Sequence, residues 1–195
     1  MHRSVSSSWW FLVLALSVLL FTSCTTSHSP ASGEERPTYT VGATGPAGGI
    51  VFYDKGEYSD GWRYFEVAPA GSETLLPWSN DQFHPNTQTA IGSGAANTDL
   101  IASFDSGSGN SAAVYCTELT IKRYSDWILP SKDELNLLFS VLGRTGKETF
   151  LKEGFAYWSS SSFDAWRAWG QGFSNGVQGR VEKQELLAVR AIRAF

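Results

Sequence analysis

YSDWILPSKDEL, residues 124–135, is the stretch around which this chain is organised. A short extended run through Trp127 ends at Pro130, which has no N–H to donate to a β-ladder. Ser131 is predicted to be a helix N-cap, and Glu134 completes a capping box with it. The following helix has one apolar face, at Leu135, Leu138, Phe139 and Leu142. We therefore expect a buried strand, with Trp127 in the core, to lead directly into a capped amphipathic helix.

The residues before this stretch predict a hairpin and then a long loop region. Residues 49–53 and 62–68 are apolar and aromatic, and a polar, glycine-flanked turn separates them, so they are expected to pair. Residues 69–111 are rich in glycine, serine and asparagine and are expected to form the loop region.

Two helices are predicted near the end of this loop region. A short one is expected over residues 99–104, capped by Asn97 or Thr98. A clearer one is expected over residues 112–122, capped by Asn110 or Ser111. Its candidate core positions include Cys116, which has no histidine near it in sequence and is interpreted as a small buried hydrophobe rather than a nucleophile.

The residues after the central helix predict strands. Residues 155–160 and 165–173 are aromatic-rich, and Asn175-Gly176 is a strong hairpin-turn signal after the second of them. Residues 186–195 are expected to form one last strand that ties the C-terminal residue into a sheet. This order of elements is α+β, with mixed or antiparallel strands, two main helices and the long loop region.

Arg193 shares strand parity with the apolar side chains of the last strand. If that face is inward, Arg193 is a buried structural cation. It then needs a carboxylate such as Asp126 or Asp133, because an unpaired buried charge is very costly.

The N-terminus has the pattern of a secretory signal. Residues 1–23 combine a weakly basic start, an apolar run over residues 9–21 and two small residues, and the run is short of the roughly 20 residues that span a bilayer. The string Phe21-Thr22-Ser23-Cys24 resembles a bacterial lipobox, in which the cysteine is lipidated and becomes the mature N-terminus. Residues 24–38 then form a polar tether. The alternative is ordinary secretion, with Cys24 trimmed away or left as a free thiol.

Residues 39–195 are expected to form one domain, large enough for a hydrophobic core. The formal net charge is −4 with Arg3 included and −5 after residues 1–23 are removed, which disfavours non-specific nucleic-acid binding. Cys116 is the only cysteine in this domain, so no disulfide within it is possible and packing must stabilise the fold.

Four motifs together resemble a known family. They are GPAGGIVFY at 45–53, YSDWILPSKDEL at 124–135, YWSSS at 157–161 and VRAIRAF at 189–195. In this order they are similar to the Legionella collagen-like protein C-terminal domain family, over residues 40–195. The resemblance implies a fold like that of C-type lectins and of formylglycine-generating enzymes. It also implies a surface location and, in some relatives, adhesion to sulfated polysaccharides by trimeric stalks; the collagen stalk is absent here.

Two segments carry the candidate ligand-binding residues. In the loop region these are Trp78, which its polar neighbours are expected to keep exposed, with Asn80 and Asp81. Aromatic faces suit the apolar faces of sugars, and polar neighbours fix the hydroxyl groups. The second segment contributes Asp164, Trp166, Arg167 and Trp169. Trp166 and Trp169 differ in parity, so in a regular strand one would face inward and one outward; a tryptophan-rich core is the alternative interpretation.

The residues of this sequence support calcium binding and catalysis less than they support glycan binding. Asn80, Asp81, Asn97, Asp99 and Asp105 could gather hard oxygen ligands for Ca²⁺, but loop Asn and Asp are more often turn formers. No cofactor is expected otherwise. The serine run at 159–162 lacks a Gly-x-Ser-x-Gly elbow. Formylglycine-generating relatives need a reactive cysteine pair, and this domain has one cysteine.

The sequence therefore predicts a lipid-anchored protein of the bacterial envelope, at the outer membrane or cell surface, whose C-type-lectin-like domain binds a glycan or host matrix and does not catalyse a reaction. The alternatives are an envelope scaffold or assembly protein and an enzyme of the formylglycine-generating type.

Overall fold

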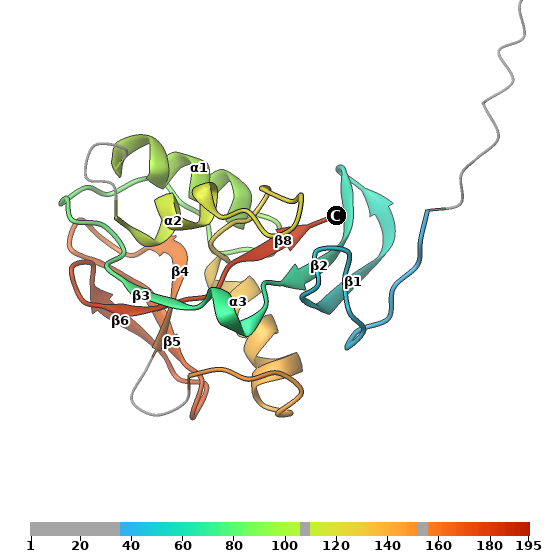
Figure 1. Cartoon of the computed structure of the whole chain (residues 1–195). Helices are drawn as coiled ribbons and strands as arrows, with labels where there is room; N and C mark the ends of the chain where they lie inside the picture. The colour runs from blue at the N-terminus through green and yellow to red at the C-terminus, as the bar shows by residue number, and fades with distance from the viewer. Residues whose placement is uncertain (1–35, 106–109, 152–155) are drawn as a thin grey trace, which may run out of the picture. The chain divides into compact units, whose positions relative to one another are not determined.

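Two β-sheets and three α-helices make up the part of the chain that the structure describes, residues 36–105, 110–151 and 156–195 of a computed structural model (Figure 1). One sheet has the antiparallel strand order β1-β2-β8. Its strands are β1 (Ile50–Ser59), β2 (Trp62–Val67) and β8 (Ile192–Ala194). The predicted pairing of the first two strands is confirmed, and β8 adds the chain terminus to the sheet.

The second sheet has the order β3-β7-β4-β5-β6, in which β4 and β7 are parallel and the other neighbours antiparallel. Its strands are β3 (Thr74–Leu76), β4 (Ala156–Ser162), β5 (Arg167–Gly172), β6 (Gln178–Glu182) and β7 (Leu187–Val189). The predicted α+β class is confirmed. The closer likeness to C-type lectins stays a prediction.

The helices are α1 (Gly94–Asp105), α2 (Ala112–Glu118) and α3 (Lys132–Leu138). Figure 1 shows α1 and α2 together on one side of the domain, and the two helices pack on each other. The expectation of a mostly irregular loop region was wrong in part. It contains the short helix η1 (Ala70–Ser72), β3 and α1, and α1 is longer at both ends than the predicted 99–104.

The central stretch has the predicted structure. Ser131 caps α3: its side chain accepts from the Glu134 N–H, and the Glu134 carboxylate accepts from the Ser131 N–H at 2.7 Å. The same carboxylate also accepts from the N–H groups of Gly92 at 2.7 Å and Gly94 at 3.4 Å. A Cβ at position 94 would lie 2.3 Å from a Glu134 oxygen, so glycine is required there. Burial raises the pKa of Glu134, while these hydrogen bonds favour its charged form.

Three tryptophans lie in the core, one of them within this stretch. Trp127 and Trp158 are buried as the sequence predicts, and Trp78 is buried beside them. Cys116 belongs to the same cluster, and burial raises the pKa of its thiol, which fits a structural side chain and not a nucleophile. A second cluster contains the apolar face of α3, through Leu135 and Leu138, packed on β1 and β2.

The predicted last strand is in fact two strands in different sheets. β7 pairs with β3 and β4, and the chain then crosses at Arg190 and Ala191 so that β8 pairs with β2. At the crossing, the Arg190 side chain turns into a buried cluster of carboxylates. The C-terminal residue is tied down as expected, because the Phe195 carbonyl accepts from the N–H groups of Arg63 and Tyr64.

Two buried arginines each lie against two carboxylates. Arg193, 5% exposed, pairs with Asp126 at 2.7 Å and with Glu66 at 3.4 Å, so the predicted partner Asp126 is confirmed and Asp133 is not a partner. Arg190, 1% exposed, pairs with Glu73 at 2.6 Å and Glu148 at 3.0 Å.

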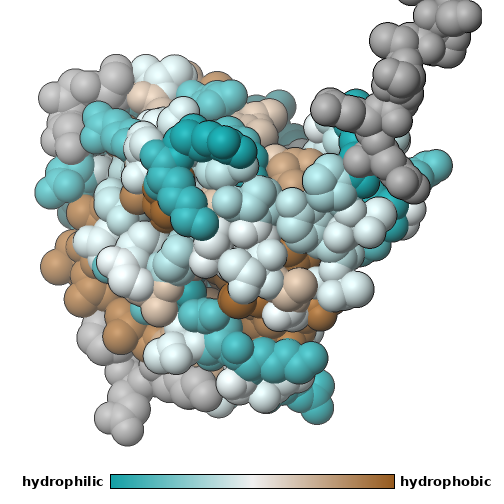
Figure 2. Space-filling model, turned by 45° about the vertical axis from the view of Figure 1, so that its right-hand side comes forward, coloured by the Kyte–Doolittle hydropathy of each residue, from teal (hydrophilic) through white to brown (hydrophobic). Residues whose placement is uncertain are grey.

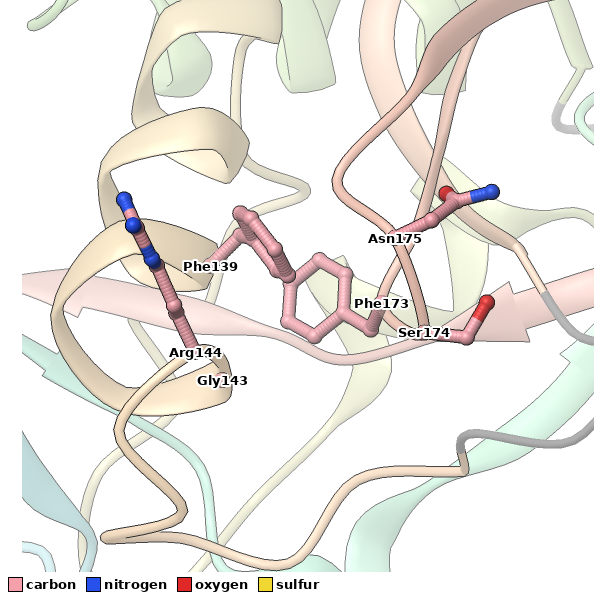
Figure 3. Close-up of a pocket in the computed structure, with 6 residues that line it drawn as sticks. All are labelled: Phe139, Gly143, Arg144, Phe173, Ser174 and Asn175. Carbon is pink, nitrogen blue, oxygen red and sulfur yellow. The ribbon is translucent and has the colours of Figure 1, made fainter.

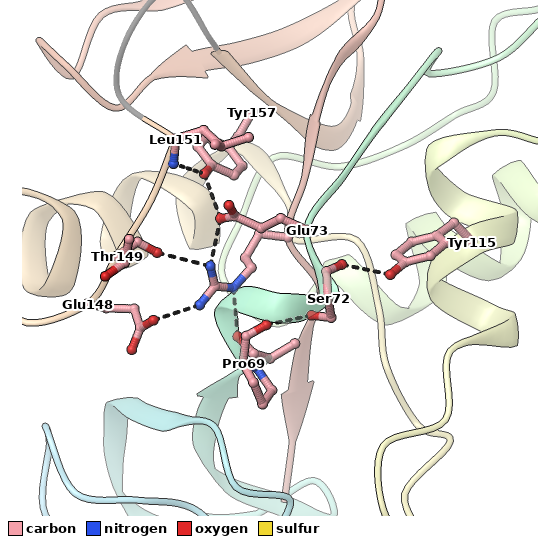
Figure 4. Close-up of polar contacts among 10 residues, drawn as sticks. Pro69, Ser72, Glu73, Tyr115, Glu148, Thr149, Leu151 and Tyr157 are labelled. Carbon is pink, nitrogen blue, oxygen red and sulfur yellow. Dashed lines mark hydrogen bonds and ion pairs between the residues drawn. The ribbon is translucent and has the colours of Figure 1, made fainter.

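Figure 4 shows Glu73, Glu148, Thr149 and Tyr157, which come from distant segments and meet in the cluster around the Arg190 guanidinium. The guanidinium also donates to the Ala68 and Thr149 carbonyls, and the Tyr157 hydroxyl donates to the Glu73 carboxylate at 2.6 Å. Burial and the Glu73 carboxylate together raise the pKa of Tyr157. The Arg190 cluster is enclosed, which makes it structural, whereas the Asp126 partner of Arg193 reaches the surface.

Candidate ligand-binding surface

Trp78 does not have the exposed position that the sequence analysis expected. Its side chain is fully buried, its indole N–H donates to the Ser159 carbonyl at 2.8 Å, and the Lys183 ammonium lies 4.4 Å from its ring centroid. Asn80 and Asp81 do lie at the surface, but Ser79 is buried with Trp78, whose indole turns under β4. A ligand therefore has no access to this ring.

The weak calcium candidates are spread apart. Asn80, Asp81 and Asp99 are exposed, whereas Asp105 is buried and accepts from the Ser79 hydroxyl at 3.2 Å. Among residues 36–105, 110–151 and 156–195, no three His, Cys, Asp or Glu side chains are placed to hold a metal ion together.

Lys183 connects this loop to the second predicted segment. Its ammonium donates to the carbonyl oxygens of Phe83 and, at 2.9 Å, of Asp164. Its own backbone accepts from the Trp78 N–H and donates to the Trp166 carbonyl, both at 2.8 Å. The side chain is only 2% exposed, and this burial lowers the pKa of Lys183 to about 8.

The second segment lies at the surface and has a defined shape. The Asp164 carboxylate accepts from the N–H groups of Trp166 and Arg167, and it pairs with the Arg167 guanidinium through two bonds of 3.0 and 2.6 Å. The guanidinium holds the pKa of Asp164 down at about 2. This tight turn presents the Trp166 side chain to solvent, 54% exposed.

The hairpin of β5 and β6 places a second tryptophan beside this turn. The register pairs Trp169 with Arg180 and Arg167 with Glu182 across the two strands. Trp169 is half-buried, and the two tryptophans do not share the regular strand on which the expectation of one inward and one outward ring depended. Trp166 precedes β5 rather than lying in it, and the inward position is taken by Ala168.

Cations flank the Trp169 indole. Lys132, at the start of α3, has its ammonium 4.6 Å from the ring centroid, and the Arg180 guanidinium lies at 5.6 Å. Arg180 also lies 4.1 Å over the Phe163 ring, and Arg167 lies 5.4 Å from it. We call Lys132, Phe163, Arg167, Trp169 and Arg180 the cation–aromatic face.

Charge on the cation–aromatic face is only partly balanced. Arg167 is paired with Asp164, but neither Lys132 nor Arg180 forms an ion pair with any residue that the structure describes. Their contacts with aromatic rings hold them in place without neutralising them. Three cations thus face two carboxylates, those of Asp164 and Glu182.

Side-chain amides extend the polar surface along the hairpin. Gln171 donates to the Asn136 carboxamide oxygen at 2.9 Å, and Gln178 donates to the Lys132 carbonyl at 3.0 Å. These bonds fasten α3 to the hairpin and so fix Lys132 beside Trp169. The arrangement offers an indole, fixed cations and amide groups, which can bind a ligand that has apolar faces, hydroxyl groups and acidic substituents.

A cavity of about 610 Å³ lies elsewhere, between the β1–β2 hairpin and residues 88–93. Its aromatic wall is Trp62, but Phe65 stacks on that indole at 4.4 Å and the Lys55 ammonium lies 3.8 Å from its centroid. The stacked Phe65 ring covers one face of the Trp62 indole, whereas the aromatic contact of Trp169, with Phe163, is edge-on at 5.7 Å, so this cavity is a weaker candidate.

A family model described as the Lcl C-terminal domain matches residues 68–193. The chain belongs to this family. The matched range contains the central stretch, the YWSSS motif and every residue of the cation–aromatic face, whereas the motif at 45–53 precedes it. A search of curated proteins found no significant match.

The sequence analysis found Arg167 and Trp169 but did not place Lys132, Phe163 or Arg180 beside them. Lys132 was treated only as a residue of the helix start, and its distance from Trp169 depends on packing between α3 and the hairpin. Arg180 had a usable signal, because it follows the predicted Asn175-Gly176 turn on the strand that must pair with β5.

Proposed function

We propose that this chain is a lipid-anchored protein of the bacterial envelope whose domain binds a glycan at the cation–aromatic face. The observation that carries the proposal is the half-exposed Trp169 indole, flanked by Lys132 and Arg180, with the exposed Trp166 nearby in sequence.

The chemistry of the face matches that of a sugar chain. A sugar ring has an apolar face of C–H groups that packs on an indole, and its hydroxyl groups bind to polar side chains at the edge. Lys132 and Arg180 would bind acidic substituents, because each carries a charge that no carboxylate neutralises in the described structure.

The tight turn and the Lys183 contacts support this role by holding the face in one shape. A preorganised surface loses little conformational entropy on binding, which improves affinity. Membership of the Lcl C-terminal domain family is consistent with surface adhesion, which the resemblance implied for some relatives. The lipid anchor at Cys24 and the envelope location are part of the proposal and rest on the sequence of residues 1–38.

A glycan array with the chain from residue 25 onward tests the proposal. We expect carbohydrate hits that Arg180→Gln weakens at least tenfold, which corresponds to roughly 1.4 kcal/mol. Arg123→Gln is the matched control, since Arg123 is also exposed and also stacks on an aromatic ring, that of Tyr124. An array without hits, together with a stable co-purified envelope protein, would instead support an assembly role.

A further inference from the structure

A separate cavity of about 470 Å³ lies at the far end of the β5–β6 hairpin. It is formed between the π-helical turn η2 (Phe139–Gly143) and the loop that joins the two strands. Figure 3 shows Arg144 on the helical side, Ser174 and Asn175 on the loop side, and the rings of Phe139 and Phe173 between them. Its volume is in the range of small-molecule sites.

The apolar wall is built from two phenylalanines. Their ring centroids are 5.3 Å apart at an interplanar angle of 64°, and Phe173 is buried whereas Phe139 is half-buried. Gly176 packs directly against the Phe139 ring, and a Cβ at position 176 would lie 2.4 Å from a ring carbon of Phe139. The rings are therefore held in place before any ligand arrives.

The helical side of the cavity has unusual backbone geometry. The Arg144 N–H donates to the Phe139 carbonyl at 2.7 Å, five residues earlier, which is the wide spacing of a π-helix. Single π-helical turns are rare and occur frequently at functional sites. Here the wide turn brings Arg144 to the edge of the aromatic wall.

The polar side chains at the edge of the cavity offer hydrogen-bond donors to a ligand. Arg144 is exposed and forms no ion pair with the described residues. The Asn175 carboxamide oxygen already accepts from the Val177 N–H at 3.0 Å, so its NH₂ group is the part left to meet a ligand. Ser174 adds an exposed hydroxyl, and no carboxylate lines the cavity.

We propose that this cavity binds a small monocarboxylate that carries an aromatic ring or a short acyl chain. The planar carboxylate would take two parallel bonds from the Arg144 guanidinium, the geometry that arginine forms best. A single cation matches a single negative charge, and the phenylalanine wall receives the apolar part of the ligand. This site is distinct from the cation–aromatic face and does not depend on the glycan proposal.

An NMR titration of the full chain after residue 24 with benzoate tests the proposal. We expect saturable binding on the order of 1 mM that shifts the signals of Phe139 and Phe173. Benzyl alcohol, which has the ring without the charge, and acetate, which has the charge without the ring, should each bind at least tenfold more weakly. Trp169→Ala should leave benzoate binding unchanged, which separates this site from the glycan site.

Arg144→Gln should weaken benzoate binding at least tenfold, whereas Arg123→Gln should not change it. Both arginines are exposed, so neither change is expected to impair folding. The proposal is overturned if Arg144→Gln binds benzoate as the wild type does, if benzyl alcohol binds equally well, or if benzoate does not shift the two phenylalanine signals.

Discussion

The Arg190 side chain ties together the residue after β2, the segment before β3 and the segment at 148–149. Arg190→Met should lower the free energy of unfolding by about 3 to 5 kcal/mol, because Glu73 and Glu148 would stay largely buried without their cation. Urea denaturation measures this loss. Arg63→Met is the control, since its pair with Asp54 is about 30% exposed on both sides and its loss should lower the free energy of unfolding far less. Equal losses of unfolding free energy in Arg190→Met and Arg63→Met would contradict the structural role of the Arg190 cluster.

Lys183 gives the stability of the domain a specific pH dependence. Burial lowers its pKa to about 8, so between pH 8 and the ordinary lysine value of 10.5 the unfolded chain binds a proton that the folded chain does not. The free energy of unfolding should therefore rise with pH in this window, by about 3 kcal/mol at most from this group. The contribution is read as the difference between wild type and Lys183→Met, in which other titrating groups cancel. If the free energies of unfolding of wild type and Lys183→Met differ by the same amount from pH 8 to 10.5, Lys183 has an ordinary pKa.

Single side chains were predictable where one physical requirement dominates. A buried cation needs a carboxylate, and this requirement named Asp126 and Asp133 as candidate partners of Arg193, of which Asp126 is the partner. Trp78 was misplaced because its polar neighbours were taken as evidence of exposure. An indole can turn under a strand while residues two and three positions later, here Asn80 and Asp81, lie at the surface, and the packing of Lys183 and β4 decides this.

The N-terminus of α3 should be more sensitive to Glu134 than to its cap. Ser131→Ala should cost about 1 kcal/mol of stability, the usual effect of losing an N-cap. Glu134→Ala should cost more, because three backbone N–H groups, those of Gly92, Gly94 and Ser131, lose their acceptor. Urea denaturation of both variants measures the difference. A smaller loss for Glu134→Ala would mean that the start of α1 is held in place without it.

The capping box was readable from sequence because it is local, whereas the register of the β5–β6 hairpin was not. The Asn175-Gly176 signal placed the turn correctly, with Gly176 at φ +77°, but the loop runs over residues 173–176 because Phe173 turns into the core. Counting outward from a two-residue turn would put Glu182 opposite Trp169. The actual register puts Arg180 there, and this decides the charge of the candidate site.

For the whole molecule, the α+β class and the family followed from the order of motifs, while the candidate site did not. The site combines α3, the turn at Asp164 and the β5–β6 hairpin, and the contacts between these parts come from packing between distant segments. The crossing of the last strand between the two sheets is a tertiary feature of the same kind, and Arg190 at the crossing pairs with carboxylates that are distant in sequence.

The proposed anchor predicts a simple change in location. In bacterial cells the wild-type chain should fractionate with membranes and incorporate labelled fatty acid, because acyl chains at Cys24 supply the membrane affinity. Cys24→Ala should abolish the labelling and move the protein to the soluble fraction. Membrane association that persists without Cys24 would show that another segment provides the attachment.

An NMR titration with a glycan selected from the array shows where the ligand binds. The readout is the set of indole N–H signals of the tryptophans. The account predicts that the signals of Trp169 and Trp166 shift, and that those of the buried Trp78, Trp127 and Trp158 stay in place. Shifts confined to Trp62, or a bound glycan that leaves Trp169 and Trp166 unchanged, would contradict it.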